Sequence, residues 1–322
     1  SGVAERPLSE RSEDMSLSDR ERVEGFRRVI SATDAVTASE RVEGFHALIT
    51  EPKPHTTTII EDTEHTRMRL TFLGTGSAMP TGERFQTGLL LESDGNTLLV
   101  DCGSGVLHGL ARTSAGYEAV DAVLLTHHHL DHVADLFPFF KARWLAGATE
   151  LTVAGPAGTE DLLDGLFDVH EYMQDRLDLT VREVDGDEFS IAGFEVAAMA
   201  VTHSMRCLAY RFAATDGTPT EDGPVVFSGD TEAMTDLIDF ADGAAILAHD
   251  CSFPDSLDVS NHASPASLGR ALADADGEIG RVYLTHLYPH TDGHHESMLD
   301  SIGAHWEGDV RFADDGLSLD IS

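Results

Sequence analysis

The stretch that decides the fold is Thr126-His127-His128-His129-Leu130-Asp131-His132, which directly follows the apolar run 120–125. The side chains in it that can bind a metal are His127, His129, Asp131 and His132. An extended turn that leads into a helix directs the first pair towards one metal ion and the second pair towards a neighbouring ion. Imidazole and carboxylate are ligands of catalytic zinc sites, which keep one position open for water. The pattern predicts a catalytic metal site directly after a buried strand. The alternative is a solvated histidine-rich loop, which would not need a buried strand before it.

Other short apolar runs also end beside a His or an Asp. They are 194–201 before His203, 225–227 before Asp230, 245–248 before His249 and 282–284 before His286. The remaining segments with strand or helix patterns are 69–73, 87–91, 97–100 and 151–154 as strands and 159–166 as a helix. Short buried strands that deliver such residues at their carboxyl ends predict a layered α/β architecture whose site lies along one sheet edge.

The charge of the chain is strongly acidic. Among 322 residues, 57 are Asp or Glu and 21 are Lys or Arg, which gives a formal net charge of −36. Such a surface repels nucleic acid and anionic lipid at low salt. Concentrated cations screen this repulsion, because the Debye length falls to about 3 Å at 1 M salt. We therefore expect a halophilic protein from a salt-adapted cytoplasm. The alternative is an ordinary acidic protein.

Cysteine usage and hydropathy bear on the compartment. Cys102, Cys207 and Cys251 are odd in number and lack the spacing of a metal knuckle, which favours a reducing compartment over a disulfide framework. No apolar run approaches the roughly 20 residues that span a bilayer, and no signal peptide is visible. These features predict a cytoplasmic protein that does not enter a membrane.

Residues 1–67 differ from the rest of the chain. They are polar, and the sequence ERVEGF occurs twice in them, at 21–26 and 40–45, each time followed by a short apolar patch. Two short amphipathic helices would fit this pattern, and a poorly ordered extension is the alternative. The stretch 51–66, with Pro52 and Pro54, is typical of a linker. We predict an N-terminal extension over 1–67 and a hydrolase domain over 68–322.

The histidine stretch resembles the signature His-x-His-x-Asp-His of the metallo-β-lactamase superfamily. The later ligands of that family match His203 in Val-Thr-His-Ser, Asp230 in Ser-Gly-Asp-Thr and His286 in Leu-Thr-His-Leu, in the same order along the chain. The resemblance covers residue 68 to the C-terminus and implies an αββα sandwich. It also implies a set of metal ligands: His127, His129 and His203 for one metal, Asp131, His132 and His286 for the other, and Asp230 between them.

The resemblance implies two zinc ions, with manganese or iron as alternatives because His and Asp suit several metals. Two cations about 3.5–4 Å apart lower the pKa of a bridging water and stabilise the attacking and leaving oxygens. In this mechanism Asp131 has a second candidate role besides binding a metal, which is to orient the hydroxide. The chain is thus expected to be a metal-dependent hydrolase.

Further motifs are similar to the ribonuclease Z and phosphodiesterase branch of the superfamily. They are Phe-Leu-Gly-Thr-Gly-Ser at 72–77, Asp-Cys-Gly-Ser-Gly at 101–105, His-Asp-Cys-Ser-Phe at 249–253 and Asn-His-Ala-Ser at 261–264. The resemblance makes His262 a candidate general acid or phosphate contact, against the reading of a surface histidine. Arg206 is a second candidate for substrate binding, because it is a cation near the ligand His203. A phosphodiester, in RNA or a nucleotide, is the implied substrate, and a homodimer is the family's expected state.

The chain also departs from ribonuclease Z. Asp250 stands where that family has Glu, and the sequence after His286 is Leu-Tyr-Pro-His. The long Gly- and Pro-rich arm that grips tRNA would fall between Gly155 and His203, an interval that is too short and too acidic. Binding of tRNA by counterion release needs a basic surface, which this acidic interval does not supply. Three alternatives to tRNA processing therefore stay open. They are a small cyclic phosphodiesterase, an arylsulfatase-type esterase, and a non-catalytic binding protein with a vestigial metal site.

Overall fold

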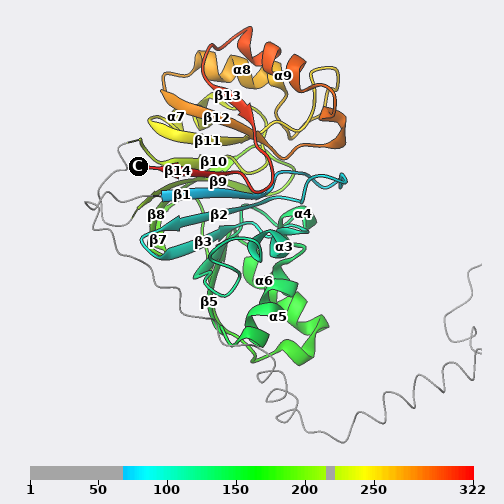
Figure 1. The fold of residues 1–322 in the computed structure, drawn as a ribbon, viewed down its shortest axis with the longest axis vertical. Coiled ribbons are helices and arrows are strands. Elements are labelled where there is room, and N and C mark those ends of the chain that lie inside the picture. The colour runs from blue at the N-terminus through cyan, green and yellow to red at the C-terminus, as the bar shows by residue number, and fades with distance from the viewer. Residues whose placement is uncertain (1–67, 215–221) are drawn as a thin grey trace, which may run out of the picture. The chain divides into compact units, whose positions relative to one another are not determined.

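The computed structural model describes residues 68–214 and 222–322. Within these residues two seven-stranded sheets pack face to face, and helices cover the outer face of each sheet (Figure 1). This arrangement confirms the predicted four-layer αββα sandwich. The repeated ERVEGF segments lie outside the described residues, and the domain boundary at residue 67 stays a prediction.

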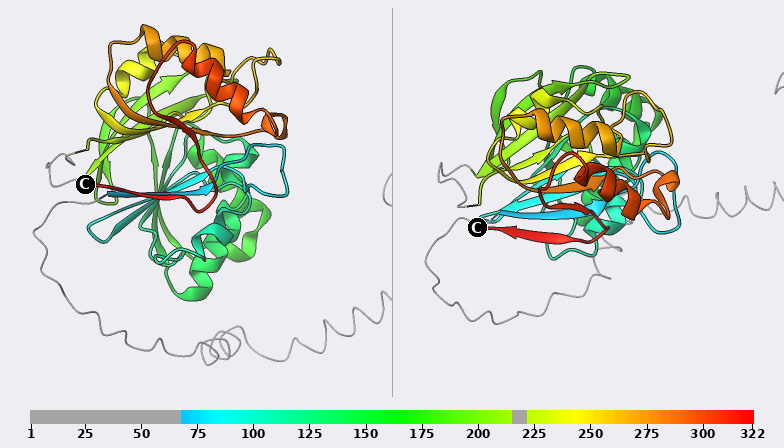
Figure 2. Two further views of the ribbon diagram at one scale, coloured as in Figure 1. Left: turned by 45° about the horizontal axis from the view of Figure 1, so that its top comes forward. Right: turned by 90° about the horizontal axis from the view of Figure 1, so that it is seen from above.

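The first sheet has the strand order β14-β1-β2-β3-β4-β5-β6. Its strands are β1 (Met68–Gly74), β2 (Gly88–Ser93), β3 (Asn96–Val100), β4 (Ala122–Leu124), β5 (Glu150–Gly155), β6 (Asp178–Glu183) and β14 (Ser318–Ile321). Strands β3 to β6 are parallel to one another. The C-terminal β14 pairs with β1, and the two strands lie side by side in red and blue in Figure 2.

The second sheet has the order β13-β12-β11-β10-β9-β8-β7. Its strands are β7 (Glu188–Ile191), β8 (Phe194–Val201), β9 (Cys207–Ala214), β10 (Val225–Phe227), β11 (Ala244–Asp250), β12 (Ile279–Thr285) and β13 (Val310–Phe312). Strands β10 to β13 are parallel, and β7 to β10 are antiparallel. Each sheet therefore has a parallel half, and the predicted site residues follow strands of these halves and of β8.

The helices form the two outer layers. They are α3 (Val106–Leu110), α4 (Leu130–Val133), α5 (Leu136–Ala146), α6 (Thr159–Val169), η2 (Glu171–Met173), α7 (Thr235–Phe240), α8 (Pro265–Asp274), η3 (Pro289–Thr291) and α9 (His295–Gly303). Three apolar clusters hold the layers together. One lies between the sheets and includes Phe72, Phe194 and Tyr210, and the other two lie between each sheet and its helices. No helix in the described ranges is long and apolar enough to span a membrane.

Strand β11 explains why several runs are apolar without alternation. Ile246 and Ala248 face the cluster between the sheets, while Leu247 faces the cluster beneath the outer helices. A parallel strand that is buried on both faces needs apolar residues at successive positions. The polar side chains are left to the strand ends, which is where the site forms.

Candidate metal centre

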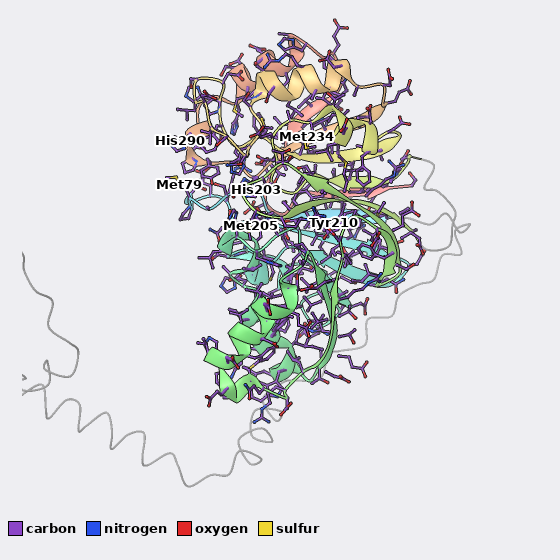
Figure 3. All side chains as sticks on the ribbon, turned by 180° about the vertical axis from the view of Figure 1, so that it is seen from behind. Met79, His203, Met205, Tyr210, Met234 and His290 are labelled. Atoms are coloured by element: carbon purple, nitrogen blue, oxygen red, sulfur yellow. The ribbon has the colours of Figure 1, made fainter. Side chains whose placement is uncertain are left out.

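Loops at the ends of four strands converge on one point. His127 follows β4, His203 follows β8, Asp230 follows β10 and His286 follows β12. His129 is the N-cap residue of α4, so Asp131 and His132 lie in the first turn of that helix. In the view of Figure 3, the labelled His203, Met79 and His290 lie at one end of the two sheets.

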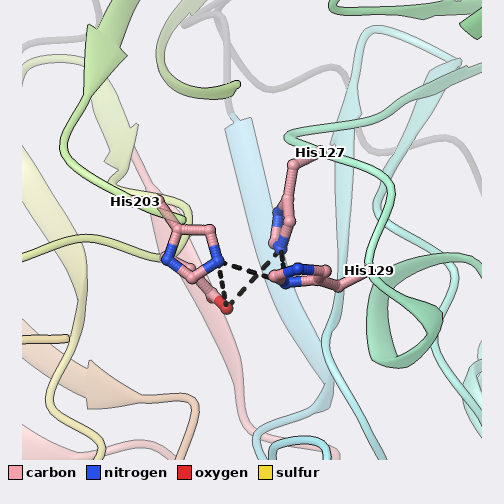
Figure 4. A group of neighbouring side chains, drawn as sticks. His127, His129 and His203 are labelled. Carbon is pink, nitrogen blue, oxygen red and sulfur yellow. Dashed lines mark hydrogen bonds and ion pairs between the residues drawn. The ribbon is translucent and has the colours of Figure 1, made fainter. Parts of the chain in front are cut away.

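Three imidazoles and one carboxylate form the first group. The Nδ1 atom of His129 lies 3.0 Å from Nε2 of His127 and 3.1 Å from Nε2 of His203. The carboxylate of Asp230 lies 3.6 Å from His127 Nε2 and 4.0 Å from His203 Nε2. Figure 4 shows His203 pointing towards His127 and His129 from a separate segment of the chain.

The second group shares Asp230 with the first. Nε2 of His286 lies 3.1 Å from Oδ2 of Asp131 and 3.1 Å from Oδ2 of Asp230. On the other side, Nε2 of His132 lies 3.3 Å from Oδ1 of Asp230. Asp131, His132, Asp230 and His286 are all buried. The structure thus brings all seven predicted ligands into two adjoining groups with Asp230 between them.

The donor atoms fit divalent metal ions. His132 Nε2 and Asp230 Oδ1 are buried and have no hydrogen-bond partner within the described part of the chain. Leaving buried polar atoms unpaired costs about 1–3 kcal/mol each, and a cation between convergent nitrogen and oxygen atoms would satisfy them. Each group contains four side chains, all of them His or Asp, which are ligands that zinc prefers. The two groups are therefore suited to divalent metals.

The electrostatics of the centre follow from burial and from the shared carboxylate. Burial lowers the pKa of His127 well below its usual value, and His132 lowers it further, so the ring is neutral and its lone pair is available. Burial opposes charge on His132, yet Asp230 and Asp101 raise its pKa well above the usual value. Burial of Asp230 is outweighed by His286 and His132, which hold its pKa well below that of a free carboxyl.

Residues 68–299 match the protein family described as Anti-Pycsar protein Apyc1. The chain belongs to this family. Among its relatives, ribonuclease Z of Mycolicibacterium gilvum is 31% identical over 252 residues, which cover 69% of this chain and 85% of the relative. Ribonuclease Z of Myxococcus xanthus is 27% identical over 303 residues, 79% of this chain and 98% of the relative.

The fold of this Apyc1-family chain is also that of a solved metallo-β-lactamase fold protein. YhfI from Bacillus subtilis superimposes with a TM-score of 0.65 at 26% identity, over 79% of this chain and 99% of YhfI. Together with the ribonuclease Z relatives, this similarity confirms the resemblance to the ribonuclease Z-like branch of the superfamily. The protein is accordingly a metal-dependent hydrolase.

Asp101 supports the second ligand group from behind, a role that the sequence did not reveal. Its Oδ2 lies 2.7 Å from Nδ1 of His132 and accepts a hydrogen bond from Thr126 Oγ1, while Oδ1 accepts from the Thr126 backbone N–H. Asp101 is fully buried and has a left-handed backbone, with φ of 59°. A carboxylate behind a ligating imidazole fixes the ring orientation and its tautomer. The signal in the sequence was the Asp-Cys-Gly turn directly after a buried strand.

We expect Asp101→Asn to weaken metal binding about tenfold or more, because support of this kind tunes metal affinity by 10–100-fold. Asn tolerates the left-handed backbone, so the change removes charge without forcing a new turn. The matched control is Asp94→Asn, since Asp94 also has positive φ but is exposed in the β2–β3 turn. Competition against a chromogenic chelator measures both variants. Equal metal affinities of the two variants would refute the role of Asp101.

A hydrogen-bonded network connects the second group to His262. Asp250 Oδ2 lies 2.8 Å from Nδ1 of His262, and Asp250 Oδ1 accepts from Ser252 Oγ at 2.6 Å. The same Ser252 Oγ lies 2.9 Å from Nδ1 of His286. Burial alone would lower the pKa of His262, but the hydrogen bond to Asp250 raises it. The Asp that replaces the Glu of ribonuclease Z therefore reaches His262 and also supports a metal-site histidine.

The structure does not bring every predicted residue into the site. Arg206 forms an ion pair with the exposed Asp185 and does not line the pocket that contains the metal centre. His128 points away from both groups and pairs with Thr159 Oγ1 at 2.9 Å. His262, in contrast, lines the pocket together with His203 and Asp230. Its place in the site agrees with a substrate contact, whereas that of Arg206 gives no support to one.

Proposed function

We propose that this protein hydrolyses phosphodiester bonds of nucleotides or RNA at a centre of two zinc ions. The observation that carries the proposal is the pair of adjoining ligand groups that share Asp230. The first metal would be held by His127, His129 and His203, and the second by Asp131, His132 and His286. Two neighbouring cations bound there would supply a water of lowered pKa and offset the negative charge that spreads over phosphoryl oxygens.

The residues around the centre have separate roles in this proposal. Asp131 accepts a proton and orients the attacking water, because its carboxylate belongs to the second ligand group and also lines the pocket. His262 donates a proton from Nε2 to the leaving oxygen. Its Nδ1 is occupied by Asp250, which fixes the ring and favours the protonated form. General acid catalysis of this kind contributes about 10²–10⁴-fold to a rate.

The site favours a small or single-stranded substrate over a folded tRNA. Between Gly155 and His203 the chain forms α6, η2, β6, β7 and β8, so the arm that the resemblance leads one to expect is absent from this fully described interval. Arg143 is buried and donates to the backbone carbonyls of Tyr117, Glu118 and Glu150. Lys141 lies over the rings of Trp144 and Tyr172. Neither of these two cations of α5 is thus part of a basic surface, which phosphate-backbone binding requires.

Substrate size is tested by offering metal-loaded full-length protein several phosphodiesters in molar KCl. The set contains cyclic mononucleotides, short single-stranded RNA and an end-labelled precursor tRNA. We expect turnover of one of the first two and no cut beside the discriminator base of the tRNA. A single cut at that position would show that tRNA processing proceeds without the arm. Homodimerisation, also a prediction, is checked in the same buffer by light scattering.

The role of His262 predicts a loss that depends on the leaving group. In His262→Ala, hydrolysis of a diester with an alkoxide leaving group should fall about 100-fold or more, because a poor leaving group needs the proton. Hydrolysis of a p-nitrophenyl diester should fall much less, since p-nitrophenolate leaves without protonation. His305→Ala, at an exposed histidine, is the control. Equal losses for both substrates would show that His262 is no general acid.

A further inference from the structure

A pocket of about 380 Å³ opens over the metal centre, and Tyr288 forms part of its wall. The pocket also contains side chains of both ligand groups, among them His203 and Asp230, together with His262. Tyr288 is half-buried and lies two positions after the ligand His286. It belongs to the Leu-Tyr-Pro-His segment, which is where the sequence departs from ribonuclease Z.

The hydroxyl of Tyr288 has no hydrogen-bond partner among the residues that the structure describes. Tyr210 is a contrast, because its hydroxyl donates to the Leu125 carbonyl at 2.8 Å. The Tyr288 hydroxyl is not sealed from solvent, so water accepts its hydrogen bond while the pocket holds no ligand. Because Tyr288 lines the pocket, a ligand there can take the place of that water as the acceptor.

The position of Tyr288 is fixed before any substrate arrives. Its backbone N–H donates to the Ser252 carbonyl at 3.3 Å, and its own carbonyl accepts from Thr291 N–H and Oγ1 at 3.0 and 2.9 Å. The ring stacks on Phe253 with centroids 4.4 Å apart. The preceding residue, Leu287, donates through its backbone to the Thr75 carbonyl at 2.9 Å. A donor held in this way loses little freedom when it binds a ligand, which is the basis of preorganised catalysis.

The ring of Tyr288 lies next to the groups that act on the substrate. Its centroid is 5.7 Å from that of His286 and 5.9 Å from that of His262, and both pairs meet edge to face. We propose that the Tyr288 hydroxyl donates a hydrogen bond to a non-bridging oxygen of the phosphoryl group that occupies the pocket. This inference rests on the proposed phosphodiesterase function and adds a catalytic residue to it. A phosphoryl group offers acceptor oxygens without donors, which matches an unpartnered O–H.

The direct test is Tyr288→Phe, which keeps the ring and its stacking on Phe253 and removes the hydroxyl alone. A hydrogen bond to a charged group contributes enough that its loss lowers kcat/KM for a phosphodiester about tenfold or more. The affinity of the metal-loaded protein for inorganic phosphate, measured by calorimetry, falls by a similar factor. Metal content and melting temperature stay at the parent values. Tyr172→Phe is the control, because Tyr172 is exposed on η2.

The two readouts separate this inference from the function on which it rests. If the parent protein cleaves no phosphodiester, the proposed function fails, and the phosphate titration still decides the role of Tyr288. The inference is overturned if Tyr288→Phe matches the parent in phosphate affinity. It is also overturned if the variant loses bound metal or melts earlier in proportion to its loss of activity, since Tyr288 would then be structural.

Discussion

Asp230→Asn is expected to abolish hydrolysis, with a loss of about a thousandfold or more, because the shared carboxylate is the one residue that both metals need. Asn has nearly the same shape but cannot offer two anionic oxygens. The change also removes the negative partner of His132 and His286, which lie 3.3 and 3.1 Å from the Asp230 oxygens. Steady-state kinetics with a chromogenic phosphodiester, together with metal analysis, measures the effect.

The control for this variant is Asp164→Asn, an exposed carboxylate on α6. We expect the control to retain full activity and both metals, whereas Asp230→Asn retains fewer than two. An Asp230→Asn protein that binds two metals and turns over at the parent rate would contradict the bridging role. A variant that binds both metals but has no activity would show that Asp230 is needed for catalysis and not for metal binding.

Metal removal has the second largest expected effect, and it acts on stability as well as activity. A ligand present at about 1,000 times its Kd stabilises the folded state by about 4 kcal/mol per site. Two sites together contribute about 8 kcal/mol, which for a domain of this size corresponds to a melting temperature about 20 °C higher. Dialysis against a chelator should therefore lower the melting temperature by that order and stop hydrolysis, and addition of zinc should restore both.

The metal that restores activity identifies the ion that works in the site. Zinc, manganese and iron are titrated separately into the chelated protein, since His and Asp ligands suit all three. An unchanged melting temperature after chelation, with metal loss verified by elemental analysis, would contradict the account. The seven residues would then form a polar cluster that is stable without bound metal.

The sequence predicted the half of the fold in which apolar runs are continuous. Strand β11, buried on both faces, has the pattern that identifies a parallel strand, and the strands predicted over 87–91 and 97–100 appear as the antiparallel pair β2 and β3. Strand β14 was missed because Ser318–Ile321 alternates polar and apolar residues over only four positions. Helix α8 was missed as well, although Ser264 and Ser267 form a capping box at its start. A short edge strand such as β14 depends on its tertiary partners more than on local pattern.

The sequence predicted which side chains gather in the candidate site but not which residues support them. The seven ligands carry their signal in spacing and order, and the structure places them together. Asp101 and Ser252 lie in motifs that the sequence shows, but each acts through a histidine far away along the chain, and the place of Tyr288 becomes clear only from the pocket that it lines. Arg206 was selected because it lies near His203 in sequence, yet one strand end can direct neighbouring side chains to different places. Asp185 lies within reach of Arg206, and the metal centre's pocket does not include it.

The most direct measurement is hydrolysis of bis(p-nitrophenyl) phosphate by zinc-loaded full-length protein, run beside p-nitrophenyl sulfate under the same conditions. The account predicts turnover of the diester that disappears on chelation and in Asp230→Asn, with little or no turnover of the sulfate ester. Hydrolysis of the sulfate ester without the diester would contradict it and favour an arylsulfatase-type esterase. No turnover of either substrate, with two metals verified per chain, would contradict it as well and favour a binding protein.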